Sequence, residues 1–159
     1  MSPSLSRAVA LAALLAVALA ARRAEATTSC AILSVDDVEL GEYDPLFGVE
    51  VDSTGGITFE CEDVGPGDSV VIAIDRGSGA SGFSPRQLLS GAHRLAYNLY
   101  MDAARMLVWG DGSAGTNAYG PVTPPSGQPL QVPIYGRIAG GQNVPVGSYR
   151  DTLTVTLVY

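Results

Sequence analysis

The sequence predicts an all-β protein, a sandwich of immunoglobulin-like size. Three observations lead to this class. About seven short segments alternate apolar and polar residues with the period of two that is typical of half-buried strands. Turn signals rich in glycine, proline and aspartate separate these segments. Beyond the N-terminal segment, no stretch keeps the 3.6-residue period of a helix.

The N-terminal segment, residues 1–26, is predicted to be a secretory signal peptide, so the folded domain is expected to cover residues 27–159. An arginine precedes fourteen uncharged, mostly apolar residues at 8–21, which are too few to span a membrane and suit a signal sequence. Cleavage is expected after Ala26 or, alternatively, after Ala20, and an uncleaved anchor is the competing interpretation.

The expected mature chain is acidic. It has six arginines, no lysine and fifteen acidic residues, a net charge of −9. Without a basic patch to hold phosphates, nucleic-acid binding is not expected. The glycines of "WGDGSAGT" (109–116) are followed by no lysine and no helix, so a phosphate loop and a small-molecule cofactor are not expected either.

Both cysteines, Cys30 and Cys61, lie in the exported part of the chain. An even number of cysteines in an oxidising compartment predicts a structural disulfide, which would contribute about 3 to 4 kcal/mol in the chain-entropy model. Together with a single histidine they are too few ligands for a zinc site, and no metal is expected.

Several strands follow from local patterns. Gly55-Gly56 is predicted to form a hairpin turn before the alternating strand 57–62. The apolar run at 69–75 predicts a central strand, and 94–102 alternates in the same way as 57–62. A further strand is expected at 105–110, leading into a turn at Asp111-Gly112.

The C-terminal half gives three more expectations. Residues 128–138 are expected to form a strand whose Pro129 and Pro133 call for an edge or an interruption, because proline cannot donate a ladder hydrogen bond. Residues 84–96 could form one helical turn, and the long stretch 110–127 is either a surface excursion or contains a short strand.

No active site is visible. His93 is the only histidine, and no serine lies in a nucleophile elbow, so an enzyme is not expected. Two further alternatives are a calcium or glycosidase site in the acidic stretch 36–44 and a sugar-binding platform of aromatic residues. A solvated acidic rim and a buried aromatic core are preferred over both. The aromatic residues concerned are Tyr100, Trp109, Tyr119 and Tyr135.

The final strand is the most informative segment. In "DTLTVTLVY" (151–159), one face carries Leu153, Val155, Leu157 and Tyr159, while threonines occupy the other. The pattern runs to the last residue given, so we expect a strand from another chain to pair with the open side of this strand.

At this point the sequence resembles the spore coat protein U domain family, which includes subunits of archaic chaperone-usher pili. Seven stretches carry the resemblance, in the right order and over most of the expected mature chain. They are the early Cys30, "LGEYDP" (40–45), "GGITFEC" (55–61), "LAYNLYMD" (95–102), "WGDG" (109–112), "IYGRIAGGQ" (134–142) and "GSYRDTLTVTLVY" (147–159).

The resemblance implies an incomplete immunoglobulin-like sandwich that lacks its last strand and is completed by donor-strand complementation. A periplasmic chaperone would lend a strand, and an outer-membrane usher would exchange it for a strand of another pilus subunit. The implied function is a structural subunit of a surface pilus or coat. A secreted spore or cell coat protein that forms no fibre, or a free carbohydrate-binding module, is the alternative.

The donor-strand groove is expected between the final strand and the first. On the final strand its residues would be Leu153, Val155, Leu157 and Tyr159, and on the first Ile32, with Leu33 if the register differs. The Cys30–Cys61 bridge would hold one wall. Only Thr27, Thr28 and Ser29 separate Ala26 from Cys30, so we expect a subunit that accepts a strand without donating one, at a tip or chain end.

Overall fold

The computed structural model describes residues 27–159, and every regular element in this part of the chain is a β-strand. The predicted signal peptide lies outside the described residues. Within 27–159 no helix could cross a membrane. The strands are β1 (Ser29–Asp36), β2 (Val51–Glu62), β3 (Val70–Ile74), β4 (Arg86–Ser90), β5 (His93–Tyr100), β6 (Tyr119–Val122), β7 (Leu130–Ile138) and β8 (Val155–Val158).

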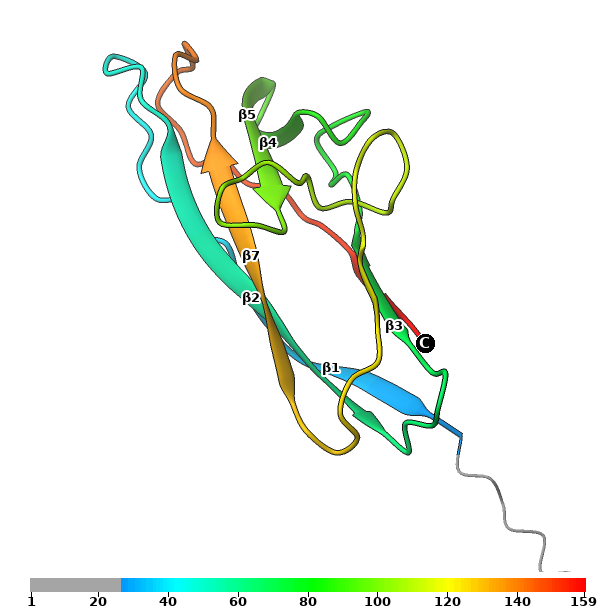
Figure 1. The fold of residues 1–159 in the computed structure, drawn as a ribbon. Helices are drawn as coiled ribbons and strands as arrows, with labels where there is room; N and C mark the ends of the chain where they lie inside the picture. Colours follow the sequence, from blue (N-terminus) through cyan, green and yellow to red (C-terminus); the bar gives the residue numbers. More distant parts are fainter. Residues whose placement is uncertain (1–26) are drawn as a thin grey trace, which may run out of the picture.

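The strands form two sheets, which confirms the predicted sandwich. The larger sheet has the order β1-β2-β7-β5-β4, and the smaller has the order β6-β3-β8. Figure 1 shows β2 and β7 on one side of the molecule, facing β3 and the C-terminal segment on the other. Side chains that alternate inward from β2, β3, β5 and β7 fill the space between the sheets, as the period of two requires.

Strand β7 lies between β2 and β5 and joins parts of the chain that are distant in sequence. It pairs with β2 along its whole length but with β5 only from Tyr135 to Ile138. Pro133 therefore lies where one side of β7 has no strand neighbour within residues 27–159, in agreement with the predicted edge. The long stretch 110–127 does contain a short strand, β6.

The expected hairpin turn at Gly55-Gly56 is wrong, because both glycines lie in the middle of β2. A Cβ at Gly55 would overlap the Asp36 carbonyl oxygen and come within 2.9 Å of the Val38 side chain. The glycine thus permits the chain that follows β1 to pass close to β2. Close approach of another part of the backbone is a known reason for a glycine inside a strand.

Three other local expectations need correction. Residues 84–96 form the β4–β5 hairpin, in which Gly91 has φ 58°, and no helical turn. The region 105–110 forms isolated bridges only, with Met106 79% exposed. Asp111-Gly112 lies at a bend, and the bridge next to it, Trp109 to Asn117, is parallel, so no hairpin forms there. A short apolar run in the sequence does not show whether a strand, a helical turn or an isolated bridge will form, because tertiary contacts decide between them.

Arg86 connects the two sheets from within the core. Its side chain is completely buried, donates to the carbonyl oxygens of Ile74, Asp75 and Trp109, and donates to Asn98 Oδ1 at 2.8 Å. Burial lowers the pKa of this guanidinium below its ordinary value. Because all of these hydrogen bonds go to oxygen atoms, they compensate the buried charge.

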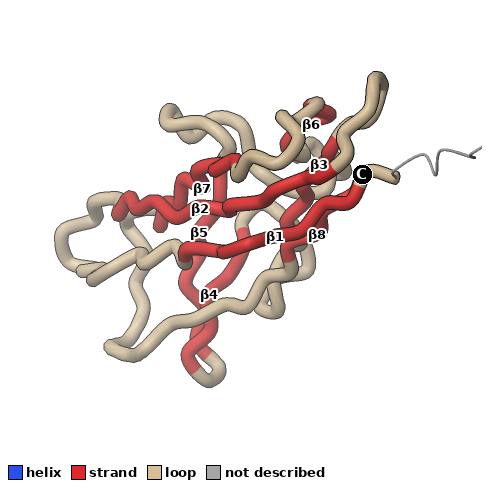
Figure 2. Tube along the Cα trace, turned by 90° about the horizontal axis from the view of Figure 1, so that it is seen from below, coloured by secondary structure: helices blue, strands red, loops and turns tan. Residues whose placement is uncertain are grey.

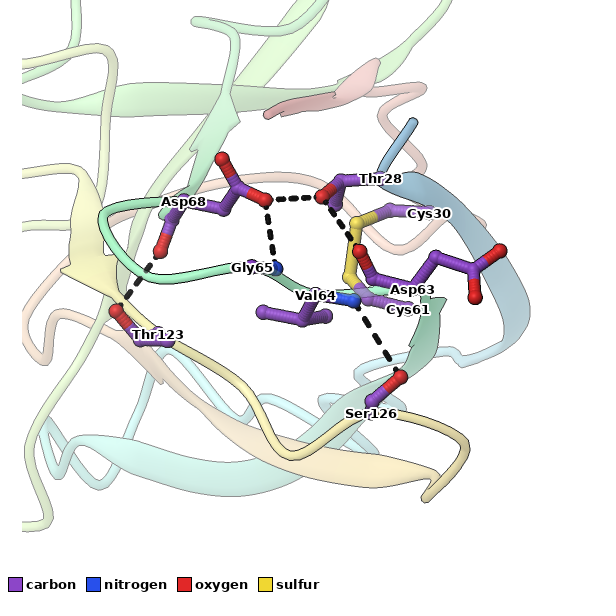
Figure 3. Close-up of a disulfide and its surroundings, with 9 residues drawn as sticks. All are labelled: Thr28, Cys30, Cys61, Asp63, Val64, Gly65, Asp68, Thr123 and Ser126. Carbon is purple, nitrogen blue, oxygen red and sulfur yellow. Dashed lines mark hydrogen bonds between the residues drawn. A yellow bond between two sulfur atoms is a disulfide. The ribbon is translucent and has the colours of Figure 1, made fainter. Parts of the chain in front are cut away.

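The predicted disulfide joins Cys30 of β1 to Cys61 of β2, which lie opposite each other in the sheet (Figure 3). The Thr28 hydroxyl lies within hydrogen-bond distance of two acceptors, the Asp63 carbonyl oxygen at 3.1 Å and the Asp68 carboxylate, between which its one hydrogen is shared. Asp68 also accepts from the Gly65 amide at 2.8 Å, and these bonds lower the pKa of its carboxyl group. The start of β1 is therefore held to the turn that follows β2.

Candidate strand-binding groove

Two edge strands face each other across one side of the sandwich. β1 ends the larger sheet and pairs only with β2, and β8 ends the smaller sheet and pairs only with β3. Figure 2 shows β1 and β8 next to each other, and the two strands approach closely. Within residues 27–159 no strand joins them, so each presents unpaired backbone N–H and C=O groups.

The inner face of β1 is incompletely covered. A bulge at Leu33 shifts the register, so that Ile32 lies opposite Phe59 and Val35 lies opposite Ile57. Cross-strand partners share a face of the sheet, and Phe59 and Ile57 are both fully buried. Ile32 and Val35 nevertheless remain 36% and 45% exposed. They point toward the interior of the sandwich, yet residues 27–159 bury each of them only in part.

A groove of about 1140 Å³ opens along this side of the molecule. It exceeds the roughly 300 to 1,000 Å³ of small-molecule pockets. Its floor is the hydrophobic core itself. The floor residues come from β3, β4, β5 and β7, and they are Ile74, Leu88, Leu95, Tyr97, Leu99, Ile134 and Ile138. An apolar floor beside the ends of two unpaired strand edges is suited to an extended peptide.

One wall of the groove is the segment 144–155, which links β7 to β8. Arg150 pairs through its backbone with Leu89 of β4, with N–O distances of 2.7 and 3.0 Å. The Tyr97 hydroxyl donates to Asp151 Oδ2 at 2.7 Å, and Ser78 donates to Asp151 Oδ1 at 2.8 Å. Burial and the hydrogen bond between Tyr97 and Asp151 raise the pKa of the Tyr97 phenol. The wall is thus anchored to the floor by a polar contact.

The opposite wall is the segment 35–45, which follows β1. Val38 and Leu40 are half-buried and cover Gly136, where a Cβ would overlap the Val38 side chain. Hydrogen bonds fix this segment at both ends. The Ser53 hydroxyl donates to the Glu39 carbonyl oxygen at 2.6 Å, and the Gln142 amide donates to Tyr43 Oη at 2.6 Å.

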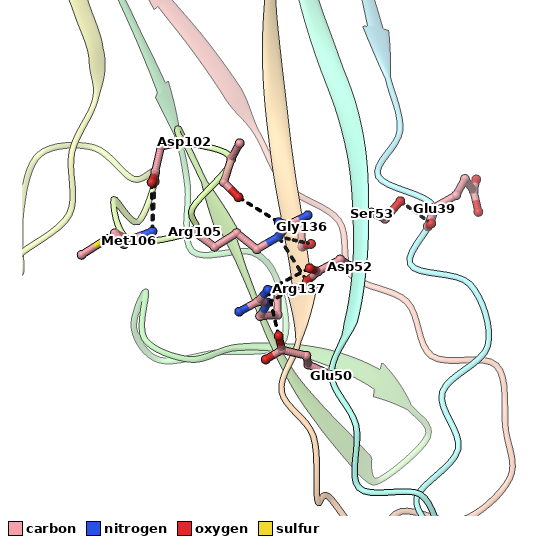
Figure 4. Close-up of polar contacts among 10 residues, drawn as sticks. Glu39, Glu50, Asp52, Ser53, Asp102, Arg105, Met106, Gly136 and Arg137 are labelled. Carbon is pink, nitrogen blue, oxygen red and sulfur yellow. Dashed lines mark hydrogen bonds and ion pairs between the residues drawn. The ribbon is translucent and has the colours of Figure 1, made fainter.

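Beside this wall, an ion-pair cluster holds β2 to β7 on the outer face of the larger sheet (Figure 4). Arg137 binds Asp52 through Nε at 2.6 Å and Nη2 at 2.8 Å, and Arg105 lies 3.1 Å from Asp52. The hydrogen bond from Arg137 lowers the pKa of Asp52. The cluster holds β2 in place. Because Ser53 of β2 donates a hydrogen bond to Glu39, the cluster also helps to fix the position of Glu39.

The structure brings together some of the residues that the sequence indicated. Leu153 and Val155 line the groove. Leu157 is half-buried against the core, and Tyr159 is 58% exposed. Ile32 faces inward on β1, whereas Leu33 lies at the bulge and is 52% exposed. Neither of them, nor Leu157 or Tyr159, is among the residues that line the groove.

Sequence reasoning missed Val35, Val38 and Leu40. Val38 and Leu40 do alternate within "VELGEY", which is a signal for one apolar face. Val35 could not be assigned from alternation, because the bulge at Leu33 interrupts the period of two between Ile32 and Val35.

The other residues that the sequence suggested for a chemical site do not form a reactive arrangement within residues 27–159. His93 is an exposed residue at the start of β5. Trp109 is fully buried and its indole N–H donates to the Ile72 carbonyl oxygen at 3.0 Å, so it belongs to the core as preferred. Within residues 27–159, no three His, Cys, Asp or Glu side chains gather in a way that could hold a metal ion.

The fold defines a class: an immunoglobulin-like β-sandwich, here with an apolar groove beside two strand edges that no strand of residues 27–159 pairs. The Spore Coat Protein U domain family matches residues 14–156, and the chain belongs to this family. A related protein, Protein U of Myxococcus xanthus, is 31% identical over 135 residues, which cover 77% of this chain and 71% of that protein.

A solved structure shares the fold. It is the pre-assembly complex of the chaperone CsuC and the tip adhesion subunit CsuE, from archaic chaperone-usher Csu pili of Acinetobacter baumannii. The TM-score is 0.56 at 20% identity, over 84% of this chain. The chain spans 40% of the chain it matches there.

Proposed function

We propose that this protein is a structural subunit of a cell-surface pilus or coat, and that its groove takes up a β-strand from another chain. One observation carries the proposal. Ile32 and Val35 face the interior but stay 36% and 45% exposed beside two unpaired strand edges. An added strand would pair with an open edge and cover these side chains.

The expected energetics agree with such a role. Four or five donor side chains, buried at about 1.5 to 3 kcal/mol each, would give roughly 6 to 15 kcal/mol before ordering costs. The whole stability of an ordinary domain is about 5 to 15 kcal/mol. The subunit should therefore be marginally stable with an empty groove and very stable once a strand fills it.

The family and the shared fold support the assembly route. A periplasmic chaperone would fill the groove first, and an outer-membrane usher would exchange its strand for that of another subunit. The subunit would thus be exported through the periplasm to the cell surface. No catalytic role is part of the proposal.

The test is expression of the full precursor with periplasmic export, with and without a chaperone encoded beside its gene. Recovery of soluble protein only as a one-to-one complex with the chaperone is the expected result. A monomer that purifies alone and melts cooperatively at high temperature would overturn the proposal, because its fold would then need no added strand. Sequencing the mature N-terminus would also test the expected signal cleavage.

A further inference from the structure

The groove has one strongly charged wall. Along the segment 35–45, four of the residues that line the groove are acidic, and none is basic. We call these four residues the acidic wall: Asp36, Asp37, Glu39 and Glu42. The opposite wall contributes Arg150 and Asp151, whose charges cancel.

The acidic wall has no counter-charge of its own. None of the ion pairs within residues 27–159 includes one of its four residues. Their carboxylate contacts amount to one long hydrogen bond, from Gln131 to Asp36 at 3.4 Å. Asp151, by contrast, is engaged by Tyr97 and Ser78. All four acidic-wall residues are exposed, so their charges act on whatever lies in the groove.

A strand in this groove would present two different faces. Every second side chain would point to the apolar floor, and the others would point outward between the walls. The acidic wall would act on those outward side chains that come within a Debye length, about 8 to 10 Å, of it. Negative charges on the outward side chains would repel the acidic wall, and positive charges would be attracted to it. Such charges affect both the association rate and the choice of partner.

We infer that the partner of this groove is an extended segment of another protein with alternating apolar side chains and with lysine or arginine at its outward positions. The inference rests on the proposed function, because it specifies the strand that fills the same groove. A second copy of this chain is a poor occupant, since residues 27–159 carry a net charge of −9 and contain no lysine.

The test appends a donor strand to the C-terminus of the full exported precursor through a flexible linker. Two donors share apolar residues at every second position and differ only in lysine or glutamate between them. A third fusion carries the linker alone. Thermal unfolding is measured at low salt and in 1 M NaCl. We expect the lysine donor to melt about 2 to 6 °C above the glutamate donor at low salt, and the difference to shrink at high salt.

Two matched variants separate the groove charge from the net charge of the protein. E39Q/E42Q removes two charges from the acidic wall and should abolish most of the difference in melting temperature between the lysine donor and the glutamate donor. E60Q/E62Q removes two charges on β2, outside the groove, and should preserve it.

Equal melting temperatures for both donors, each well above linker alone, would overturn the charge preference and leave the strand-binding groove intact. The charge preference would also be overturned if E60Q/E62Q abolished the difference in melting temperature between the two donors as fully as E39Q/E42Q. If neither donor melts above the linker-only fusion, the proposed function itself fails.

Discussion

Ile32 on β1 and Phe59 on β2 are direct cross-strand partners, yet Phe59 is completely buried while Ile32 is 36% exposed. Both side chains point to the inside of the sandwich. Phe59 belongs to the hydrophobic core, whereas residues 27–159 cover Ile32 only in part. This difference between two neighbours is the observation on which the proposed strand-binding site rests.

The first prediction concerns Ile32. Ile32→Ala should change the stability of the empty subunit little, because the side chain is already partly in water. In a strand-complemented form the same substitution should cost about 2 to 4 kcal/mol, because it then leaves a cavity. Urea unfolding of the protein with and without an appended donor strand measures the two costs.

Leu33→Ala is the control, because Leu33 lies at the bulge and 52% of it is exposed. It should have a small effect in both forms. A larger cost for Leu33 than for Ile32 after complementation would contradict the register of β1 and place Leu33 in the groove.

The second prediction concerns pH and the contact between Tyr97 and Asp151. The folded state raises the pKa of the phenol above its ordinary value of 10.0. Tyr97 therefore contributes stability below pH 10, and this contribution is lost as the pH rises further, because only the unfolded phenol ionises readily. Unfolding followed between pH 8 and pH 12 should show this loss.

Tyr97→Phe removes the ionising group and the hydrogen bond to Asp151, so it should lower stability at pH 8 but flatten the alkaline loss. Tyr135→Phe, at a half-buried tyrosine outside the groove, is the control and should leave the loss unchanged. An unchanged alkaline slope in Tyr97→Phe would show that another group causes it.

The third prediction concerns Gly136, which makes room for Val38 of the acidic-wall segment. Gly136→Ala should cost about 1 to 3 kcal/mol through overpacking and should displace the wall at residues 38–40. Gly82→Ala is the matched control, since nothing lies within 4 Å of its Cβ position, and it should change stability by less than about 0.5 kcal/mol. Equal effects of the two substitutions would mean that the wall does not depend on close contact at Gly136.

The fourth prediction concerns the bond between Cys30 and Cys61, which closes a loop of 31 residues. Replacing both cysteines with alanine should lower stability by about 3 to 4 kcal/mol in the chain-entropy model. Chemical unfolding of the parent protein with and without reductant should give a similar loss, and reductant should not affect the double variant. A reductant-insensitive parent protein would contradict a stabilising role for the bond.

Much of the fold could be predicted from local patterns. Alternation identified the strand that carries Ile57, Phe59 and Cys61, the strand with Val132 and Ile134, and the inward face of Leu153 and Val155. These signals are local, because a strand half-buried in a sheet places every second residue inside. The cysteine pair and the family stretches were also visible in the sequence.

The elements that depend on distant contacts were not predictable in this way. Gly55-Gly56 read as a turn because glycine is common in turns, whereas here glycine lets the Asp36 backbone pass close to β2. The bulge at Leu33 hid the inward position of Val35. Both cases involve chain segments that meet only after folding.

The sequence by itself determined the class of this protein: an acidic, all-β chain of the Spore Coat Protein U domain family with one pair of cysteines. The tertiary structure alone decided where the groove lies and what lines it. It inserts β7 between β2 and β5, sets β1 and β8 at two open edges, and folds Val38 and Leu40 over Gly136. The physical reason is that alternation along a strand is a local property, whereas an open edge depends on which distant strands have paired.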